Sequence, residues 1–167
     1  MKDFYKLYKE CIEELYRIGI YPKPFKQWRE IDHSQGVWGY CCDLGNGAFG
    51  LELQKDLLND GTDDAALKDT IIHELIHTLP GCFDHGSQWD EIAARVRAAY
   101  PAYLLLPAGG TNRYRIEYTE RPVCTWHCPN CGWSTADFSK RRKHRKTDPV
   151  AYQCPLCKGR LKRVDYT

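Results

Sequence analysis

The segment His73-Glu74-Leu75-Ile76-His77 constrains the fold of this 167-residue chain more than any other feature. Two histidines four residues apart lie on one face of an α-helix, one turn above the other. Their imidazoles can therefore converge on a single metal ion if the segment is helical. The apolar spacing around it predicts a helix from about residue 62 to residue 79, which Pro80-Gly81 would end.

A catalytic zinc ion takes three protein ligands and keeps one coordination position open. His85 follows His77 by eight residues, beyond the predicted turn, and can fold back onto the ion. Asp84 and Asp90 remain alternatives for the third ligand. Zinc is the default metal for histidines in this pattern, although manganese or another ion is also compatible with it.

Glu74 lies next to the first histidine and near the same helix face, where it can bind the metal's water rather than the metal. Zinc lowers the pKa of that water, and the carboxylate can take its proton and pass it to a departing amine. The segment therefore predicts metal-assisted peptide hydrolysis, with Glu74 as the catalytic base and His73, His77 and His85 as the ligands. Asp69, one turn before His73, could orient a ligand, but we favour a solvated helix position for it.

A second pattern of metal ligands lies near the C-terminus. Cys128-Pro-Asn-Cys131 and Cys154-Pro-Leu-Cys157 are two C-x-x-C pairs, 22 residues apart. Thiolates at this spacing bend round one ion, and two pairs complete a closed tetrahedral site, which predicts a structural zinc. Cys124 and His127 lie close by and could substitute for a ligand, though nothing in the sequence favours them.

Charge is distributed unevenly along the chain. Residues 1–112 carry 11 Lys and Arg against 17 Asp and Glu, a net charge of −6, whereas residues 113–167 carry 13 against 5, a net charge of +8. A basic run lies between the two cysteine pairs, formed by Lys140, Arg141, Arg142, Lys143, Arg145 and Lys146. Such runs attract phosphate backbones by releasing counterions, so we expect single-stranded DNA or another nucleic acid as a partner.

Aromatic residues near this run have two interpretations. Trp126, Trp133, Phe138 and Tyr152 could stack on unpaired bases, or they could form the core of a small module. The run itself could equally be a solvated loop that only aids solubility.

These patterns predict an α+β protein with two domains, residues 1–112 and residues 113–167. Apolar spacing predicts a packing helix over residues 4–18 and another from residue 87 to about residue 100. Residues 37–42 and 48–53 are predicted strands, joined by a loop that contains Asn46-Gly47 and is longer than two residues. We expect the strand at 48–53 to align an extended substrate. Short strands are predicted around the cysteines, beginning at residues 113–118.

The sequence contains no apolar run long enough to cross a bilayer, and its N-terminus lacks the apolar core of a signal peptide. We therefore expect a cytoplasmic protein with no membrane partner, for which a nucleoid or nuclear location is also compatible. Nine cysteines in such a chain favour metal sites over disulfides.

Together these motifs resemble the SprT-like family of zinc metallopeptidases, which includes Spartan-like proteases. The resemblance rests on Trp38-Gly39-Tyr40-Cys41, on the segment 73–77, on His85-Gly86-Ser87-Gln88-Trp89, and on the two C-x-x-C pairs around a basic loop. It implies a compact zincin domain followed by a four-cysteine zinc ribbon, with one catalytic and one structural zinc. It also implies, by analogy, action on proteins bound or crosslinked to DNA.

Two other functions remain open. The chain could be a zinc-ribbon module that binds nucleic acid or regulates, with a zincin domain that does not cleave; the intact Glu74 argues against this. It could also be a peptidase whose ribbon only braces the fold or docks a protein. Salt dependence would separate these functions, because phosphate contacts weaken steeply as salt rises.

Overall fold

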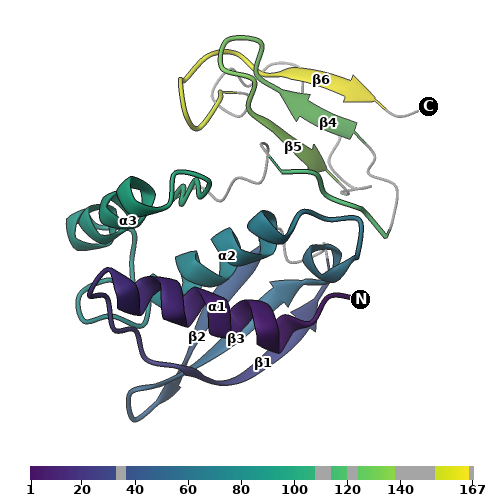
Figure 1. The fold of residues 1–167 in the computed structure, drawn as a ribbon. Helices are drawn as coiled ribbons and strands as arrows, with labels where there is room; N and C mark the ends of the chain where they lie inside the picture. The colour runs from purple at the N-terminus through teal and green to yellow at the C-terminus, as the bar shows by residue number, and fades with distance from the viewer. Residues whose placement is uncertain (33–36, 108–113, 120–123, 138–152, 166–167) are drawn as a thin grey trace.

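A computed structural model describes residues 1–32, 37–107, 114–119, 124–137 and 153–165 of the chain (Figure 1). Over these residues the protein has three α-helices and two three-stranded sheets, which confirms the predicted α+β class. The predicted boundary near residue 112 lies outside the described residues. So do the basic run at 140–146, Phe138 and Tyr152.

Helix α1 (Phe4–Arg17) packs one face onto the rest of the protein, as its apolar spacing predicts. Phe4, Leu7, Cys11 and Leu15 are buried on that face. At its N-terminus the Asp3 side chain accepts a hydrogen bond from the backbone N–H of Lys6 (3.1 Å), which caps the helix.

The first sheet has the strand order β1-β3-β2, formed by β1 (Phe25–Ile31), β2 (Gly39–Gly45) and β3 (Ala48–Gln54). β1 runs parallel to β3, and β2 runs antiparallel to it. Asn46 and Gly47 alone join β2 to β3, both with positive φ (52° and 70°), which is typical of the tight turns that connect hairpins. The predicted longer loop is therefore wrong. The extra residue, Leu44, lies in a register shift within β2.

β3 occupies the centre of this sheet, hydrogen-bonded to a strand on each side. A substrate cannot add itself to a strand whose two edges are already paired, so the expectation that residues 48–53 align a substrate is wrong. Among the described strands, β2 is at one edge and β1 at the other.

Helices α2 (Asp64–Ile76) and α3 (Ser87–Ala99) complete the first core. Figure 1 shows α1 and α2 on the same face of the first sheet. Residues on several sides of α2 are fully buried, because the helix lies between the sheet, α1 and α3; they include Ala66, Leu67, Ile71, Ile72, Leu75 and Ile76. α2 ends three residues earlier than the sequence predicted, since a tighter turn follows it, closed by the Thr78 N–H on the Leu75 carbonyl (3.0 Å).

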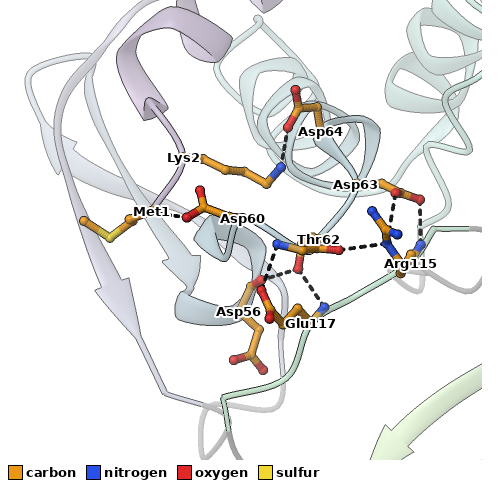
Figure 2. Close-up of polar contacts among 10 residues, drawn as sticks. Met1, Lys2, Asp56, Asp60, Thr62, Asp63, Asp64, Arg115 and Glu117 are labelled. Carbon is orange, nitrogen blue, oxygen red and sulfur yellow. Dashed lines mark hydrogen bonds and ion pairs between the residues drawn. The ribbon is translucent and has the colours of Figure 1, made fainter.

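Residues 114–119 cross the N-terminal end of α2 and the 3₁₀ helix η2 (Lys55–Leu58) without forming a strand, so the strand predicted at 113–118 is wrong. Their polar groups instead bond to residues 56–63. Figure 2 shows the Arg115 side chain beside Asp63, and the Glu117 N–H donating to the Thr62 hydroxyl (2.8 Å). The Asp63 N–H in turn donates to the Arg115 carbonyl (2.8 Å). This segment therefore belongs to the packed N-terminal unit.

The second sheet has the order β5-β4-β6, formed by β4 (Cys124–His127), β5 (Ser134–Asp137) and β6 (Lys162–Asp165). It stands apart from the first sheet in Figure 1. Its core is small: Cys128, Trp133 and Cys154 are buried together, and Leu161 packs against them. Trp133 is thus a core residue here, with only 7% of its surface exposed.

No helix among the described residues combines the length and the apolar character that a bilayer crossing requires.

Candidate metal centres

Three histidines meet at the C-terminal end of α2. His73 lies in the last turn of the helix, His77 caps it, and His85 lies in the turn before α3. Their ring nitrogens all lie within 4.8 Å of one another, with 2.9 Å between Nε2 of His73 and Nε2 of His85. The sequence therefore predicted the residues that come together. Neither Asp84 nor Asp90 belongs to the group, and the Asp84 carboxylate instead accepts the Gly86 N–H (3.2 Å).

The surroundings favour imidazoles that are neutral and fixed in orientation. Burial and the neighbouring imidazoles lower the pKa of His73 to about 3, and burial also lowers the pKa of His77 and of His85. Neutral imidazole is the form that binds a metal. Nδ1 of His77 lies 2.8 Å from the Cys82 carbonyl, which leaves Nε2 for the cluster. This donor set fits one metal ion.

Trp89 packs against all three histidine rings. Its ring centroid lies 4.8 Å from those of His73 and His85 and 5.9 Å from that of His77, and the side chain is fully buried. The indole therefore restricts how far each imidazole can tilt.

Glu74 points toward β2. The backbone N–H of Cys41 donates to its carboxylate, and burial raises the pKa of Glu74 to about 8. β2 can approach this closely because Gly39 has no side chain: a Cβ there would lie 2.6 Å from Cγ2 of Thr70 and 3.1 Å from Cγ of Glu74. Nothing in the sequence pattern indicated that the strand backbone would hold the acid.

The histidines and Glu74 line one cavity of about 620 Å³. This volume lies within the range of roughly 300–1,000 Å³ that is typical of ligand sites. Its remaining walls come from β2, from the loop after α2, from the chain after α3 and from the cysteine sheet, and include Val37, Tyr40, Phe83, Leu106, Pro107 and Trp133. Among the described lining residues the acidic side chains are Asp69 and Glu74, and none is Lys or Arg.

Asp69 is buried, with 6% of its surface exposed, so the favoured prediction of a solvated position is wrong. Its carboxylate accepts the backbone N–H of Leu105 (3.0 Å). Burial raises the pKa of Asp69 to about 7, although hydrogen bonds from Leu105, Leu104 and Tyr114 act in the opposite direction. Asp69 thus joins α2 to the segment that carries Leu106 and Pro107 along the cavity wall. That partner lies 36 residues away, so local sequence gave no sign of it.

The four cysteines Cys128, Cys131, Cys154 and Cys157 also come together, as predicted. Sγ of Cys128 lies 3.5 Å from Sγ of Cys157, and Sγ of Cys131 lies 3.5 Å from Sγ of Cys154. These separations exceed a disulfide bond of about 2.05 Å and approach the roughly 3.8 Å between thiolates that share a tetrahedral zinc. Neither Cys124 nor His127 joins the group.

The two cysteine turns share one backbone geometry. The Gly132 N–H bonds to the Cys128 carbonyl, and the Lys158 N–H bonds to the Cys154 carbonyl, each at 2.9 Å. Both donors have positive φ, 77° for Gly132 and 60° for Lys158. Although burial raises the pKa of the Cys128 thiol, backbone N–H groups of Cys131 and Asn130 bring it down to about 7. The backbone of the first turn therefore favours the thiolate form of Cys128, the form that a metal requires.

The donor sets thus allow two metal ions, one at the histidines and one at the cysteines. Comparisons with models of known protein families, with curated proteins and with solved structures gave no match.

Proposed function

We propose that this chain is a zinc-dependent metallopeptidase with a SprT-like zincin domain and a C-terminal zinc ribbon. One observation carries the proposal: three histidine nitrogens and the Glu74 carboxylate face the same cavity beside the edge strand β2. Three nitrogen ligands with access to a cavity match a catalytic zinc site, which keeps one position for water or substrate.

His73, His77 and His85 would hold the zinc ion. When bound there, zinc supplies Lewis acidity, which activates water and polarises a peptide carbonyl. The Cys82 carbonyl orients His77, and Trp89 packs against all three rings.

Glu74 performs the proton transfers in this proposal. Its carboxylate takes a proton from the attacking water and delivers it to the amine nitrogen as the peptide bond breaks. A neighbouring cation favours the ionised form of a carboxyl group, which offsets the effect of burial on the pKa of Glu74. The Cys41 N–H keeps the side chain at the strand edge.

β2 would align the substrate in place of the central strand. Ladder hydrogen bonds in antiparallel pairs alternate from residue to residue. The Cys41 N–H points away from β3 to Glu74, so Gly39 and Asp43, two residues to each side, present their backbone groups outward as well. An extended peptide can pair with these groups and place its carbonyl beside Glu74.

The decisive test is Glu74→Gln in protein loaded with zinc. We expect the variant to keep both metals and to lose about 10²–10⁴-fold in kcat/KM on an unfolded protein substrate. Glu91→Gln is the matched control, because Glu91 is an exposed acid on α3 and the change is chemically the same. Metal content is measured by elemental analysis alongside the rate.

Cleavage that persists in Glu74→Gln would contradict the assigned base. No cleavage by the wild-type protein, with both sites shown to be filled, would favour the alternative function, a nucleic-acid-binding or regulatory module.

We further propose that the C-terminal unit recruits nucleic acid, so that proteins bound to it are cut. Support comes from the net charge of +7 over residues 120–167, where 11 Lys and Arg stand against 4 Asp and Glu, and from the basic run at residues 140–146. Phosphate contacts of this kind lose affinity as salt rises.

The test is cleavage of a DNA-binding protein with and without single-stranded DNA, at low and high salt. Stimulation by DNA that salt abolishes supports recruitment. Glu74-dependent cleavage that ignores DNA contradicts it, and then a ribbon that braces the fold or docks a protein is the better account.

A further inference from the structure

The loop between the second and third histidines exposes an aromatic ring into the cavity. Phe83 is 53% exposed and lines the same cavity as His77, His85 and Glu74. Large apolar side chains that face solvent beside a polar site are candidates for contact with a ligand.

The position of Phe83 is tied to the metal site. The preceding residue, Cys82, is buried, and its N–H donates to the Leu79 carbonyl (3.1 Å). The Cys82 carbonyl lies 2.8 Å from Nδ1 of His77. The backbone that enters Phe83 is therefore fixed to the same imidazole that would bind the metal.

The ring itself is braced from the side. Its centroid lies 6.3 Å from that of Phe49 at the start of β3, and Nζ of Lys23 lies 5.6 Å from the Phe49 centroid on a third element. A side chain supported in this way loses little conformational entropy when a second apolar group packs onto it.

The electrostatics of the cavity point to an apolar substrate side chain. Among its described lining residues no Lys or Arg is present to pair with an acidic side chain, whereas Phe83, Val37 and Leu106 offer apolar surface. An acidic side chain would therefore lose its hydration without gaining a Lys or Arg partner, and zinc at the histidines would be engaged by water or the peptide carbonyl, so burying the acid costs free energy.

We infer that Phe83 determines specificity: it packs against the substrate side chain on one side of the scissile bond and selects aromatic or large aliphatic residues there over acidic ones. This inference rests on the proposed peptidase function. Apolar contacts of this size change kcat/KM by about tenfold or more.

The experiment uses the zinc-loaded full chain and a set of quenched fluorescent peptides that differ at one residue flanking the cleaved bond. Phe, Leu, Ala and Asp are compared on each side of that bond. We expect the peptide with Phe to be cut at least about tenfold faster than the peptide with Asp, on one side only. Phe83→Ala should reduce this ratio severalfold, and Phe83→Leu should retain the preference for Leu.

Tyr21→Ala is the matched control, because Tyr21 is another exposed aromatic residue (68%) and does not line the cavity. It should cut the whole set at wild-type rates. Melting temperatures of all variants show whether they remain folded.

Two outcomes overturn the inference and are distinguishable. If Glu74-dependent cleavage occurs but the wild type shows no preference, or Phe83→Ala keeps the wild-type preference unchanged, Phe83 does not select the substrate and the peptidase function stands. If no peptide and no protein is cut in a Glu74-dependent manner, the proposed function fails, and the inference fails with it.

Discussion

The histidine site and the cysteine site differ in what surrounds their donors. Three histidine nitrogens line a cavity together with a buried acid, whereas four sulfurs in two tight turns face one another. Three donors at a cavity leave room for substrate, and four donors leave none. The same metal would therefore take part in catalysis at one site and stabilise the fold at the other.

The two sites also differ in what supports them. The histidines lie on a helix inside a large core, in which Ile71, Ile72, Leu75 and Trp89 are fully buried. The described core of the cysteine unit is limited to Cys128, Trp133 and Cys154, with Leu161 against them. Apolar burial thus holds the first site in place, while the second unit depends on its own ligands.

Removing metal should reveal the largest difference between the two units, because only one of them should unfold. We expect a strong chelator to empty both sites, to leave the N-terminal unit folded and to unfold the sheet of β4, β5 and β6 with its two cysteine turns, because a structural zinc contributes about 10–16 kcal/mol to such modules. Far-ultraviolet circular dichroism and limited proteolysis with mass spectrometry measure the two effects.

Single ligand substitutions provide the control for chelation. His85→Ala should leave the cysteine unit resistant to protease, and Cys131→Ser should expose it to protease. A chelated protein in which both units resist protease equally would contradict the difference in support.

Lowering the pH should change the folding stability of the two units in opposite directions. The folded-state pKa of Asp69, about 7, lies above its ordinary value of 3.8, so its protonated form favours folding. That contribution is complete below about pH 4 and is lost as pH rises through about 7, at about 1.4 kcal/mol for each unit of pKa difference. The cysteine unit instead loses stability as pH falls, because protons compete with metal for thiolates.

Asp69→Asn isolates the first effect, since the amide has the same shape and does not titrate. We expect the unfolding free energy of the variant relative to the wild type to rise between pH 4 and pH 7 and then level off, as measured by urea denaturation at fixed salt. A difference that does not change with pH would show that Asp69 remains ionised throughout.

The smallest expected effect concerns the two cysteine turns, which differ in the residue that adopts the left-handed conformation. Lys158 adopts the left-handed conformation that glycine adopts at the matching position, Gly132. Lys158→Gly should therefore stabilise the unit by about 0.5–1 kcal/mol, and Gly132→Lys should destabilise it by about 1–2 kcal/mol. Thermal unfolding of the zinc-loaded protein measures both. If both changes destabilise the unit equally, backbone strain at Lys158 is not the cause.

Both clusters of donors could be predicted from the sequence because they depend on short-range spacing. Helical periodicity places His73 and His77 on one face, Pro80-Gly81 returns the chain to His85, and each C-x-x-C turn closes locally. Where partners are distant in sequence, prediction failed. The burial of Asp69 depends on Leu105, and the central position of β3 depends on β1.

Two strand predictions failed for other reasons: β1 was missed, and the strand expected at residues 113–118 is not formed. β1 was not predicted, because its apolar residues Phe25, Trp28 and Ile31 are spaced by three rather than by two; the register shift between Phe25 and Gln27 accounts for the first interval only. Residues 114–118 alternate as a strand does, yet they bond to residues 56–63 at the start of α2 and so add to neither sheet. Alternation alone does not show whether a partner strand is present.

Because Trp89 contacts all three imidazoles, its fluorescence should report whether the histidines hold a metal ion. An indole within 4.8–5.9 Å of each ring centroid is sensitive to the charge and motion of those rings, so its emission should change when they close round an ion. Metal uptake at the histidines could then be followed in real time, without a dye, as the part of the tryptophan emission change that Trp89→Phe removes from the signal of the five tryptophans.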